Sequence, residues 1–426
     1  MANEKTFKKT RLSQRGKAFL AFFCGILCLV SYAAAYYGAL NVSQASIAEY
    51  FGVATSQVTL YYTFQCLSAV CCGLLGAWLL KKFNLHGGAC IGGIVGFCGS
   101  MICAFANGIW MIYLGACCFG FCVNMCGPAM LQTITSTWFY KGRATLLGIG
   151  GMTEALGTTS LSLLTAWFIS NQGVGGYRYG LIIGGCCMLA TGILCYFLIG
   201  GTPADFGFSP LGAEGTAAAT KEDGEASGID AKTAKRMPCF WILMSSALVF
   251  NIGYACFQPQ LSGRIQSLGY TAVQAAVAVS IWSWSKGTSK ILYGYVADRW
   301  GLQISLMSFS AFATVLVVIY ALTTSLPVIY ACAIGIGIIG GITGAFTLAV
   351  SRMVGPKGFL GLATIPHAFG SLGAATGPIF YRTFFTADTA GYRLGTLVGA
   401  VFLVGFLVLI YIALQPKNMF EKDRAI

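Results

Sequence analysis

The sequence predicts an all-α polytopic membrane protein with twelve transmembrane helices, and three observations carry that prediction. Of its 426 residues, 57% are hydrophobic and only 9% are charged, whereas about a quarter of the residues in a soluble globular domain are charged. The hydrophobic residues fall into runs long enough to cross a hydrocarbon core of ~30 Å as helices. Short polar segments rich in Lys and Arg separate these runs, as is typical of polytopic membrane proteins.

Six hydrophobic runs follow a basic N-terminal segment, at residues 18–40, 56–80, 88–106, 109–138, 144–170 and 177–200. Residues 201–237 then break the pattern with two prolines, a Gly/Ala/Glu-rich stretch and a basic cluster, so we interpret them as a polar linker. Six further runs follow, at 239–262, 271–295, 302–322, 326–350, 358–382 and 391–414. The predicted organisation is two helical units, 1–200 and 238–426, joined by this linker.

The distribution of Lys and Arg predicts the orientation in the membrane. Twenty of the 26 basic residues fall in the two terminal segments, the linker and the loops on the same side, and four fall on the opposite side. Under the positive-inside rule, both termini then lie in the cytoplasm and the protein resides in the cell membrane. Because the basic residues cluster between hydrophobic runs, we read them as a topology signal and expect a lipid bilayer rather than nucleic acid as the partner.

The sequence shows no pattern of a metal site or an enzyme. Nearly all of the 18 cysteines lie inside hydrophobic runs, and there are only two histidines, so no ligand spacing typical of zinc is present. No acid pair or Ser-His-Asp set suggests catalysis. We therefore predict a protein without cofactor or catalytic activity.

Two lysines interrupt the hydrophobic run at 271–295. Lys286 and Lys290 are four residues apart, so on a helix their ammonium groups share one face. Counted back from Asp298 at ~1.5 Å per residue, they lie ~18 and ~12 Å deep, near the middle of the bilayer. Each costs at least ~2.5–3.5 kcal/mol there, so each should face an acidic group or a cavity. The functional interpretation is a cationic patch for a carboxylate; the alternative is that one lysine reaches the interface or loses its charge.

Glu154 and His367 are the other ionisable residues in mid-span, and they occupy equivalent positions in the two halves. Residues 148–158, GIGGMTEALGT, align with residues 361–371, GLATIPHAFGS, at a constant offset of 213. Glu154 is the natural counter-ion of Lys286; its other interpretations are a purely structural ion pair or a protonated carrier of the coupling proton. His367 is either a base in the site or a hydrogen-bonding group between helices.

Two loop segments resemble motifs of a known family. Residues 294–301, GYVADRWG, resemble the G-x-x-x-D-R-x-G signature of the major facilitator superfamily, although the corresponding first-half loop has Leu80 in place of the acid. Residues 138–148, WFYKGRATLLG, resemble the W-F-x-x-R-R-G-x-A-x-G-I pattern of the oxalate–formate antiporter and monocarboxylate transporter group. The resemblance implies two pseudo-symmetric six-helix bundles that meet with the fifth and eighth spans side by side.

The same resemblance implies candidate site residues. By its spacing to the loop signature, Lys290 matches one substrate-binding base of the antiporter group, and His367 matches the second, in the eleventh span. Asp298 and Arg299 would belong to a gating loop. The candidate lining residues with hydroxyl, amide or aromatic groups include Tyr36, Tyr37, Asn124, Tyr254, Gln258 and Trp282.

The sequence therefore predicts a secondary active transporter that moves a small organic anion, a mono- or dicarboxylate, by alternating access. Its mode is antiport or proton-coupled symport. The alternative is efflux of amphipathic or lipophilic compounds, which the aromatic and Met content leaves open. A membrane sensor is disfavoured because the linker, at under forty residues, has no room for a signalling domain. We expect a monomer.

Overall fold

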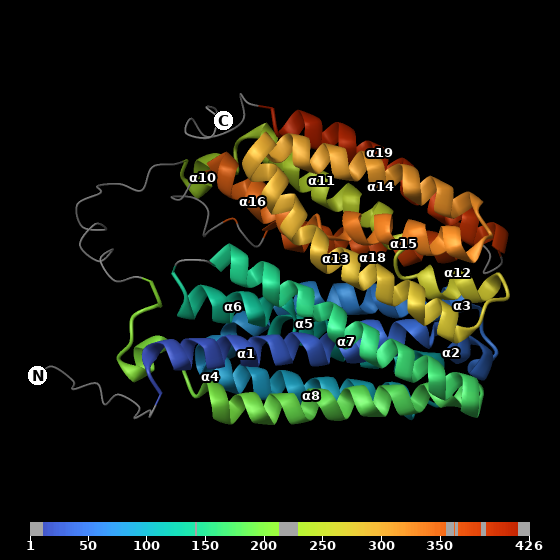
Figure 1. The fold of residues 1–426 in the computed structure, drawn as a ribbon, viewed down its shortest axis with the longest axis horizontal. Coiled ribbons are helices and arrows are strands. Elements are labelled where there is room, and N and C mark those ends of the chain that lie inside the picture. The colour runs from blue at the N-terminus through green and yellow to red at the C-terminus, as the bar shows by residue number, and fades with distance from the viewer. Residues whose placement is uncertain are drawn as a thin grey trace, which may run out of the picture.

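The computed structural model describes residues 12–140, 143–212, 229–354, 362, 365–384 and 389–415. Over this part of the chain the secondary structure is helical, apart from one isolated β-bridge between Phe139 and Leu211. The long helices run roughly parallel to the long axis of the molecule, and the helices of the two halves form two stacked groups (Figure 1). The predicted all-α class is confirmed.

The first half of the chain begins with α1 (Gln14–Ala33), which continues without a break as the π-helix η1 (Ala34–Leu40). The other helices of this half are α2 (Gln44–Phe51), α3 (Thr55–Val58), α4 (Leu60–Ala104), α5 (Ile109–Met125), α6 (Pro128–Trp138), α7 (Arg143–Gln172), the short 3-10 helix η2 (Val174–Gly176) and α8 (Tyr177–Ile199).

Two breaks in this half follow from the local sequence. Asn84 kinks α4 with a φ of 60°, and the predicted runs 56–80 and 88–106 lie on either side of it. The run at 109–138 divides into α5 and α6 at Gly127 and Pro128. Proline has no N–H to continue the preceding helix, and its fixed φ suits the first turn of the next one.

The connection between the halves is anchored at both of its ends. Beyond the 3-10 helix η3 (Pro203–Phe206), the Leu211 amide donates to the Trp138 carbonyl at 2.8 Å. Before the short helix α10 (Ala231–Ala234), the Ile229 amide donates to the Val354 carbonyl at 2.8 Å. Residues 213–228 of the predicted linker lie outside the described residues.

The second half contains eight described helices. They are α11 (Pro238–Ala255), α12 (Leu261–Ser267), α13 (Ala272–Trp300), α14 (Leu302–Leu322), α15 (Leu326–Gly340), α16 (Thr343–Val354), α18 (Ile365–Phe384) and α19 (Thr389–Ala413). The predicted run 239–262 is not one helix, because the chain breaks between α11 and α12 around Pro259. Proline disfavours the α conformation at the residue before it and removes a backbone donor.

The eighth predicted run also extends further than expected. The predicted run ends at residue 295, whereas α13 continues to Trp300 and stops at Gly301, whose φ of 92° is left-handed. Asp298 and Arg299, which were assigned to a gating loop, therefore lie in the last helical turn of α13. That assignment to a loop was wrong.

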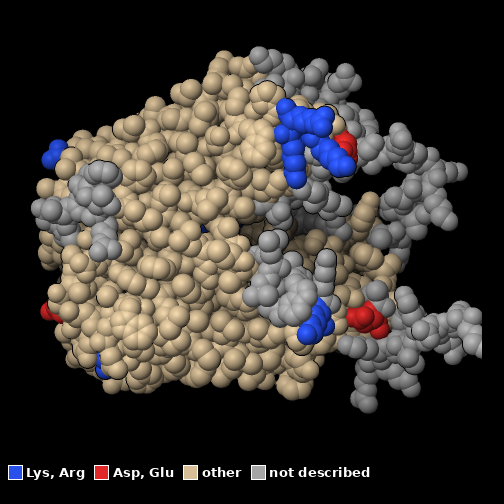
Figure 2. Space-filling model, turned by 180° about the vertical axis from the view of Figure 1, so that it is seen from behind, with Lys and Arg blue, Asp and Glu red and all other residues tan. Residues whose placement is uncertain are grey.

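Seven helical segments of the described chain are long and hydrophobic enough to cross a membrane: Gln14–Leu40, Lys82–Ala104, Ile109–Trp138, Val174–Ile199, Pro238–Ala255, Leu302–Leu322 and Ala390–Ala413. Helix α13 is long enough but carries Lys286 and Lys290 in its middle. On the face shown in Figure 2, the charged side chains lie at the two ends of the helices and the broad middle is uncharged. A surface of this kind suits the hydrocarbon region of a bilayer.

Each half has a hydrophobic core made mostly of its own residues. Phe119, Trp138 and Tyr177 are buried in the first core, and Phe250 and Phe406 are buried in the second. The halves meet where α7 packs along α13 and α4 packs along α18, a contact we call the seam. Helices α2, α3 and α12 lie at one end of the molecule, the far end; α1 starts and α19 stops at the other, the terminal end (Figure 1).

Candidate functional site

The seam holds a cluster of three charged side chains. Glu154 of α7 accepts from two lysines of α13: Lys286 Nζ lies 2.8 Å from Oε1, and Lys290 Nζ lies 3.5 Å from Oε2. The exposed fractions of these side chains are 6% for Glu154, 13% for Lys286 and 24% for Lys290. A buried ion cluster thus joins the two halves, and Lys290 is its most accessible member.

Glycines on both helices allow this close approach. A Cβ at Gly287 of α13 would lie 3.0 Å from the Cα of Met152, so the two helix backbones nearly touch there. A Cβ at Gly151 of α7 would lie 3.1 Å from Lys290 Nζ. These glycines were not among the predicted site residues, although Gly151 belongs to the GIGG stretch that precedes Glu154.

Aromatic side chains surround Lys286. Its Nζ lies 4.8 Å from the ring centroid of Tyr37 and 5.2 Å from that of Trp282, within cation–π range. Trp282 is buried and donates from Nε1 to the Tyr254 hydroxyl at 2.8 Å. Gly340 of α15 leaves room for that hydroxyl, because a Cβ there would collide with it. One carboxylate and two rings therefore hold Lys286.

Three other predicted lining residues make their described contacts elsewhere. Tyr36 in η1 donates from its hydroxyl to Gln65 Oε1 of α4 at 3.2 Å. Asn124 donates from Nδ2 to the carbonyl of Ala69 at 3.3 Å, so both side chains tie helices of the first half together. Gln258 is buried in the turn between α11 and α12.

The described structure shows no contact between the remaining predicted residues and the charged cluster. His367 is exposed in the first described turn of α18, and no hydrogen bond joins it to another described residue. Arg299 donates from Nη1 to the Tyr295 hydroxyl at 2.9 Å on the same helix. The side chain of Asp298 is outside the described part of the structure. The equivalence of Glu154 and His367 in sequence is thus not matched by equivalent contacts.

Hydrogen bonds hold the two halves together towards the far end. Gln44 Nε2 donates to the carbonyl of Pro259 at 2.7 Å, across from α2 to the α11–α12 turn. Thr63 Oγ1 of α4 donates to the carbonyl of Ala375 of α18 at 2.7 Å. Towards the terminal end, by contrast, Figure 2 shows a recess between the two groups of helices. These two hydrogen bonds between the halves thus lie towards the far end, and the recess lies towards the terminal end.

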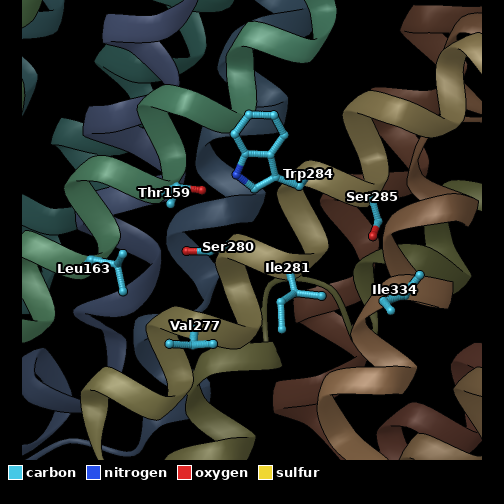
Figure 3. Close-up of a pocket in the computed structure, with 8 residues that line it drawn as sticks. All are labelled: Thr159, Leu163, Val277, Ser280, Ile281, Trp284, Ser285 and Ile334. Atoms are coloured by element: carbon cyan, nitrogen blue, oxygen red, sulfur yellow. The ribbon is translucent and has the colours of Figure 1, made fainter.

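A hydrophobic cavity of about 430 Å³ lies beside the seam (Figure 3). Thr159 and Leu163 of α7, Ile334 of α15 and a stretch of α13 between residues 277 and 285 line it. The lining residue Trp284 is 41% exposed, so the cavity opens to the outside of the helix bundle. None of the three charged residues lines this cavity, so the cavity is separate from the charged cluster.

The chemistry available to the cluster is electrostatic. Two ammonium groups and one carboxylate can bind an anion or exchange partners, and amino groups hydrogen-bond carboxylates well. Among the described residues, no group of three or more His, Cys, Asp or Glu side chains could hold a metal ion.

Comparison with known proteins identifies the family. The sequence profile of the Major Facilitator Superfamily matches residues 22–263, more than half of the chain. A search of curated proteins gives no significant match. A bacterial homologue of the human lysosomal transporter Spinster, solved in an inward-facing, unoccupied conformation, is similar with a TM-score of 0.70 at 17% identity, over 97% of this chain and 100% of that chain.

Two further solved structures are similar. The occupied, inward-facing form of the same Spinster homologue has a TM-score of 0.71 at 16% identity, over 96% of this chain and 98% of that chain. The nucleoside transporter NupG has a TM-score of 0.66 at 13% identity, over 94% of this chain and 100% of that chain. At these identities the likeness shows a shared fold. Together with the profile match, it establishes that this chain belongs to the Major Facilitator Superfamily, as a multi-pass membrane transporter.

Proposed function

We propose that this transporter carries a small organic anion, a mono- or dicarboxylate, across the cell membrane by secondary active transport. The observation that supports this substrate class is the sharing of Glu154 by Lys286 and Lys290. A cation in the membrane interior costs ~2.5–3.5 kcal/mol or more unless it is paired. One carboxylate cannot neutralise the charge of two ammonium groups, so the cluster favours the binding of a second carboxylate, that of the substrate.

Lys290 is the proposed anchor for that anion. Its distance to Glu154 is the longer of the two, at 3.5 Å, and its side chain is the more exposed of the two lysines. Glu154 is the proposed interdomain ion pair or coupling group, since it links α7 to α13. Trp282 and Tyr254 are the proposed aromatic cover of the site. His367, Tyr36, Asn124 and Gln258 remain predicted contacts of the ligand.

Alternating access is the proposed mechanism. The hydrogen bonds between the halves lie towards the far end and a recess lies towards the terminal end, so an anion would reach the cluster from the terminal side. Rocking of the two helical units, 1–200 and 238–426, about the seam would then expose the cluster to the other side. We place both termini and the linker 201–237 in the cytoplasm, in line with the Lys and Arg distribution, with the protein acting as a monomer.

Uptake by the purified protein in liposomes tests the substrate class. We expect Lys290→Gln to lose uptake of a labelled monocarboxylate such as lactate, and Lys290→Arg to retain part of it because the charge remains. Lys82→Gln is the matched control, since it makes the same change at an exposed position of α4. Wild-type uptake by a folded Lys290→Gln protein would refute the role of Lys290.

A second candidate function rests on the hydrophobic cavity in Figure 3. A cavity of about 430 Å³ is within the size range of sites for small lipophilic molecules. Efflux of amphipathic compounds would use this cavity instead of the lysines. Ile281→Trp would narrow the cavity and leave the charged cluster in place. If this variant loses transport of a lipophilic dye while Lys290→Gln retains it, efflux is the correct function.

A further inference from the structure

With all three groups ionised, the charged cluster has a formal net charge of one positive unit. It contains two ammonium groups and one carboxylate, joined at 2.8 and 3.5 Å. The other acidic residues of the described chain lie elsewhere: Glu49 near the far end, Asp205 and Asp230 in the connection between the halves, and Asp298 in the last turn of α13. Asp298 is eight residues from Lys290, or ~12 Å along the helix. No described acid therefore balances the remaining charge.

The two lysines are not equivalent partners of Glu154. Lys286 makes the shorter contact and also lies against the rings of Tyr37 and Trp282. Lys290 makes a contact at the outer limit of a hydrogen bond and has no such aromatic cover in the described structure. Beside it, Gly151 presents no side chain, and even a single added carbon would come within 3.1 Å of Nζ. The unsatisfied positive charge is thus located at Lys290.

We infer that the site takes up one net negative charge per ligand: a monoanion whose single carboxylate binds Lys290 while Lys286 stays paired with Glu154. This inference rests on the proposed function and narrows it from mono- or dicarboxylates to monoanions. A monoanion makes the loaded cluster neutral, because two positive charges then face two negative charges. A dianion would leave one unpaired negative charge in the low-dielectric seam, which is unfavourable for the closed state.

Ligands that differ in charge but hardly in shape provide the test. Oxalate, malonate and succinate are dianions at neutral pH, and their monoamides oxamate, malonamate and succinamate are monoanions of the same length. We would measure the concentration of each that gives half-maximal thermal stabilisation of the purified full-length protein. For the chain length that binds best, we expect the wild type to bind the monoamide at least ~10-fold more tightly than the diacid.

Substitutions that change the cluster charge should change this preference. Glu154→Gln raises the net charge to two positive units, so the preference should reverse towards the diacid. Lys290→Gln lowers it to zero, so both anions should bind weakly. Glu49→Gln, the same change as Glu154→Gln at an exposed position, should leave the preference as in the wild type. If Glu154→Gln does not fold, the wild-type preference alone decides.

The outcomes separate this inference from the proposed function. If the wild type binds a diacid more tightly than its monoamide, the inference is wrong but the proposed anion transport still stands. Glu154 would then be protonated when the ligand is bound. An unchanged preference in a folded Glu154→Gln protein would overturn it as well. If no anion of any charge stabilises the wild-type protein against heat, and none is taken up into liposomes that contain it, the proposed function itself fails.

Discussion

Arg264 is a buried cation and the lysines are partly buried cations, but the two are held by different kinds of group. Arg264 of α12 donates from Nη2 to the carbonyls of Ala321 and Thr323 at 3.1 and 3.0 Å, and its guanidinium carbon lies 4.0 Å from the Tyr320 ring centroid. All of these partners belong to the second half. The lysine pair faces a carboxylate that belongs to the first half.

Under the proposed function, Arg264 is a structural cation, whereas the lysines are cations whose partner can be exchanged. Backbone carbonyls and an aromatic ring are fixed parts of one packed unit, so a ligand cannot replace them without local unfolding. A carboxylate, by contrast, can share its lysines with another carboxylate of the same chemistry. Burial of a charge is therefore a weak sign of function, whereas the type and origin of its partner are informative.

Removal of the carboxylate from the lysine cluster should have the largest effect. Glu154→Gln leaves two buried ammonium groups without a counter-charge, which typically costs ~3–5 kcal/mol. We expect a large fall in the thermal unfolding temperature of the purified protein, recorded in detergent without ligand. Glu49→Gln should leave that temperature unchanged. A Glu154→Gln protein as stable as the wild type would mean that the cluster is hydrated and contributes little to stability.

Loss of the structural cation should affect stability without affecting ligand charge preference. Arg264→Met removes hydrogen bonds from a charged donor and the stacking on Tyr320, at a cost of ~1.5–3 kcal/mol. Thermal unfolding measures that loss, and anion stabilisation measures the preference. Arg299→Met, at an exposed position, serves as control. If Arg264→Met alters the ligand preference, the distinction between the two cations does not hold.

The two lysines should differ in a smaller but measurable way. Lys286→Gln breaks the 2.8 Å contact and the aromatic contacts, whereas Lys290→Gln breaks only the 3.5 Å contact. We expect Lys286→Gln to lower the free energy of unfolding by ~1–2 kcal/mol more than Lys290→Gln. Chemical or thermal unfolding of both variants, without ligand, gives this difference. Equal losses would contradict the assignment of Lys286 as the standing partner of Glu154.

The aromatic cover should make the smallest contribution. Tyr254→Phe removes the acceptor of the Trp282 Nε1–H bond and leaves a buried donor unpaired, at ~1 kcal/mol or slightly more. Indole fluorescence and thermal unfolding report this change. Tyr295→Phe is a matched control on an exposed tyrosine of α13. An effect larger than that of Lys286→Gln would show that the rings, rather than the carboxylate, hold Lys286.

The helices were largely predictable because a bilayer imposes simple rules. Each of the twelve hydrophobic runs overlaps at least one described helix, since a membrane segment must satisfy its backbone hydrogen bonds within itself. The breaks were harder to predict. Pro259 and Pro128 carried a signal in sequence, but hydrophobicity alone does not show where a run divides. The π-helical turn η1 has no comparable signal.

The candidate site was predictable only in part. Lys286, Lys290 and Glu154 stand out because ionisable residues are costly in mid-membrane, and the family resemblance places their helices side by side. The uneven sharing of Glu154 was not predictable, because it depends on side-chain geometry at the helix crossing. His367 shows the converse: its place in the internal repeat matches that of Glu154, yet repeat symmetry in sequence does not guarantee the same neighbours.

Two hydrogen bonds join the halves at the far end, one between Gln44 and Pro259 and one between Thr63 and Ala375. They affect the free energy needed to separate the halves there. When such a contact opens to the aqueous side, water replaces each lost partner, so the net loss is only ~0.5–1.5 kcal/mol per bond. A closure made of interlocked apolar side chains would instead expose hydrocarbon to water on opening. Water can therefore replace these two hydrogen bonds at the far end, whereas the apolar contact of Cys66 with Ala374 and Ala375 beside them has no such replacement. Under the proposed alternating access, most of the work of opening this end would come from that apolar contact.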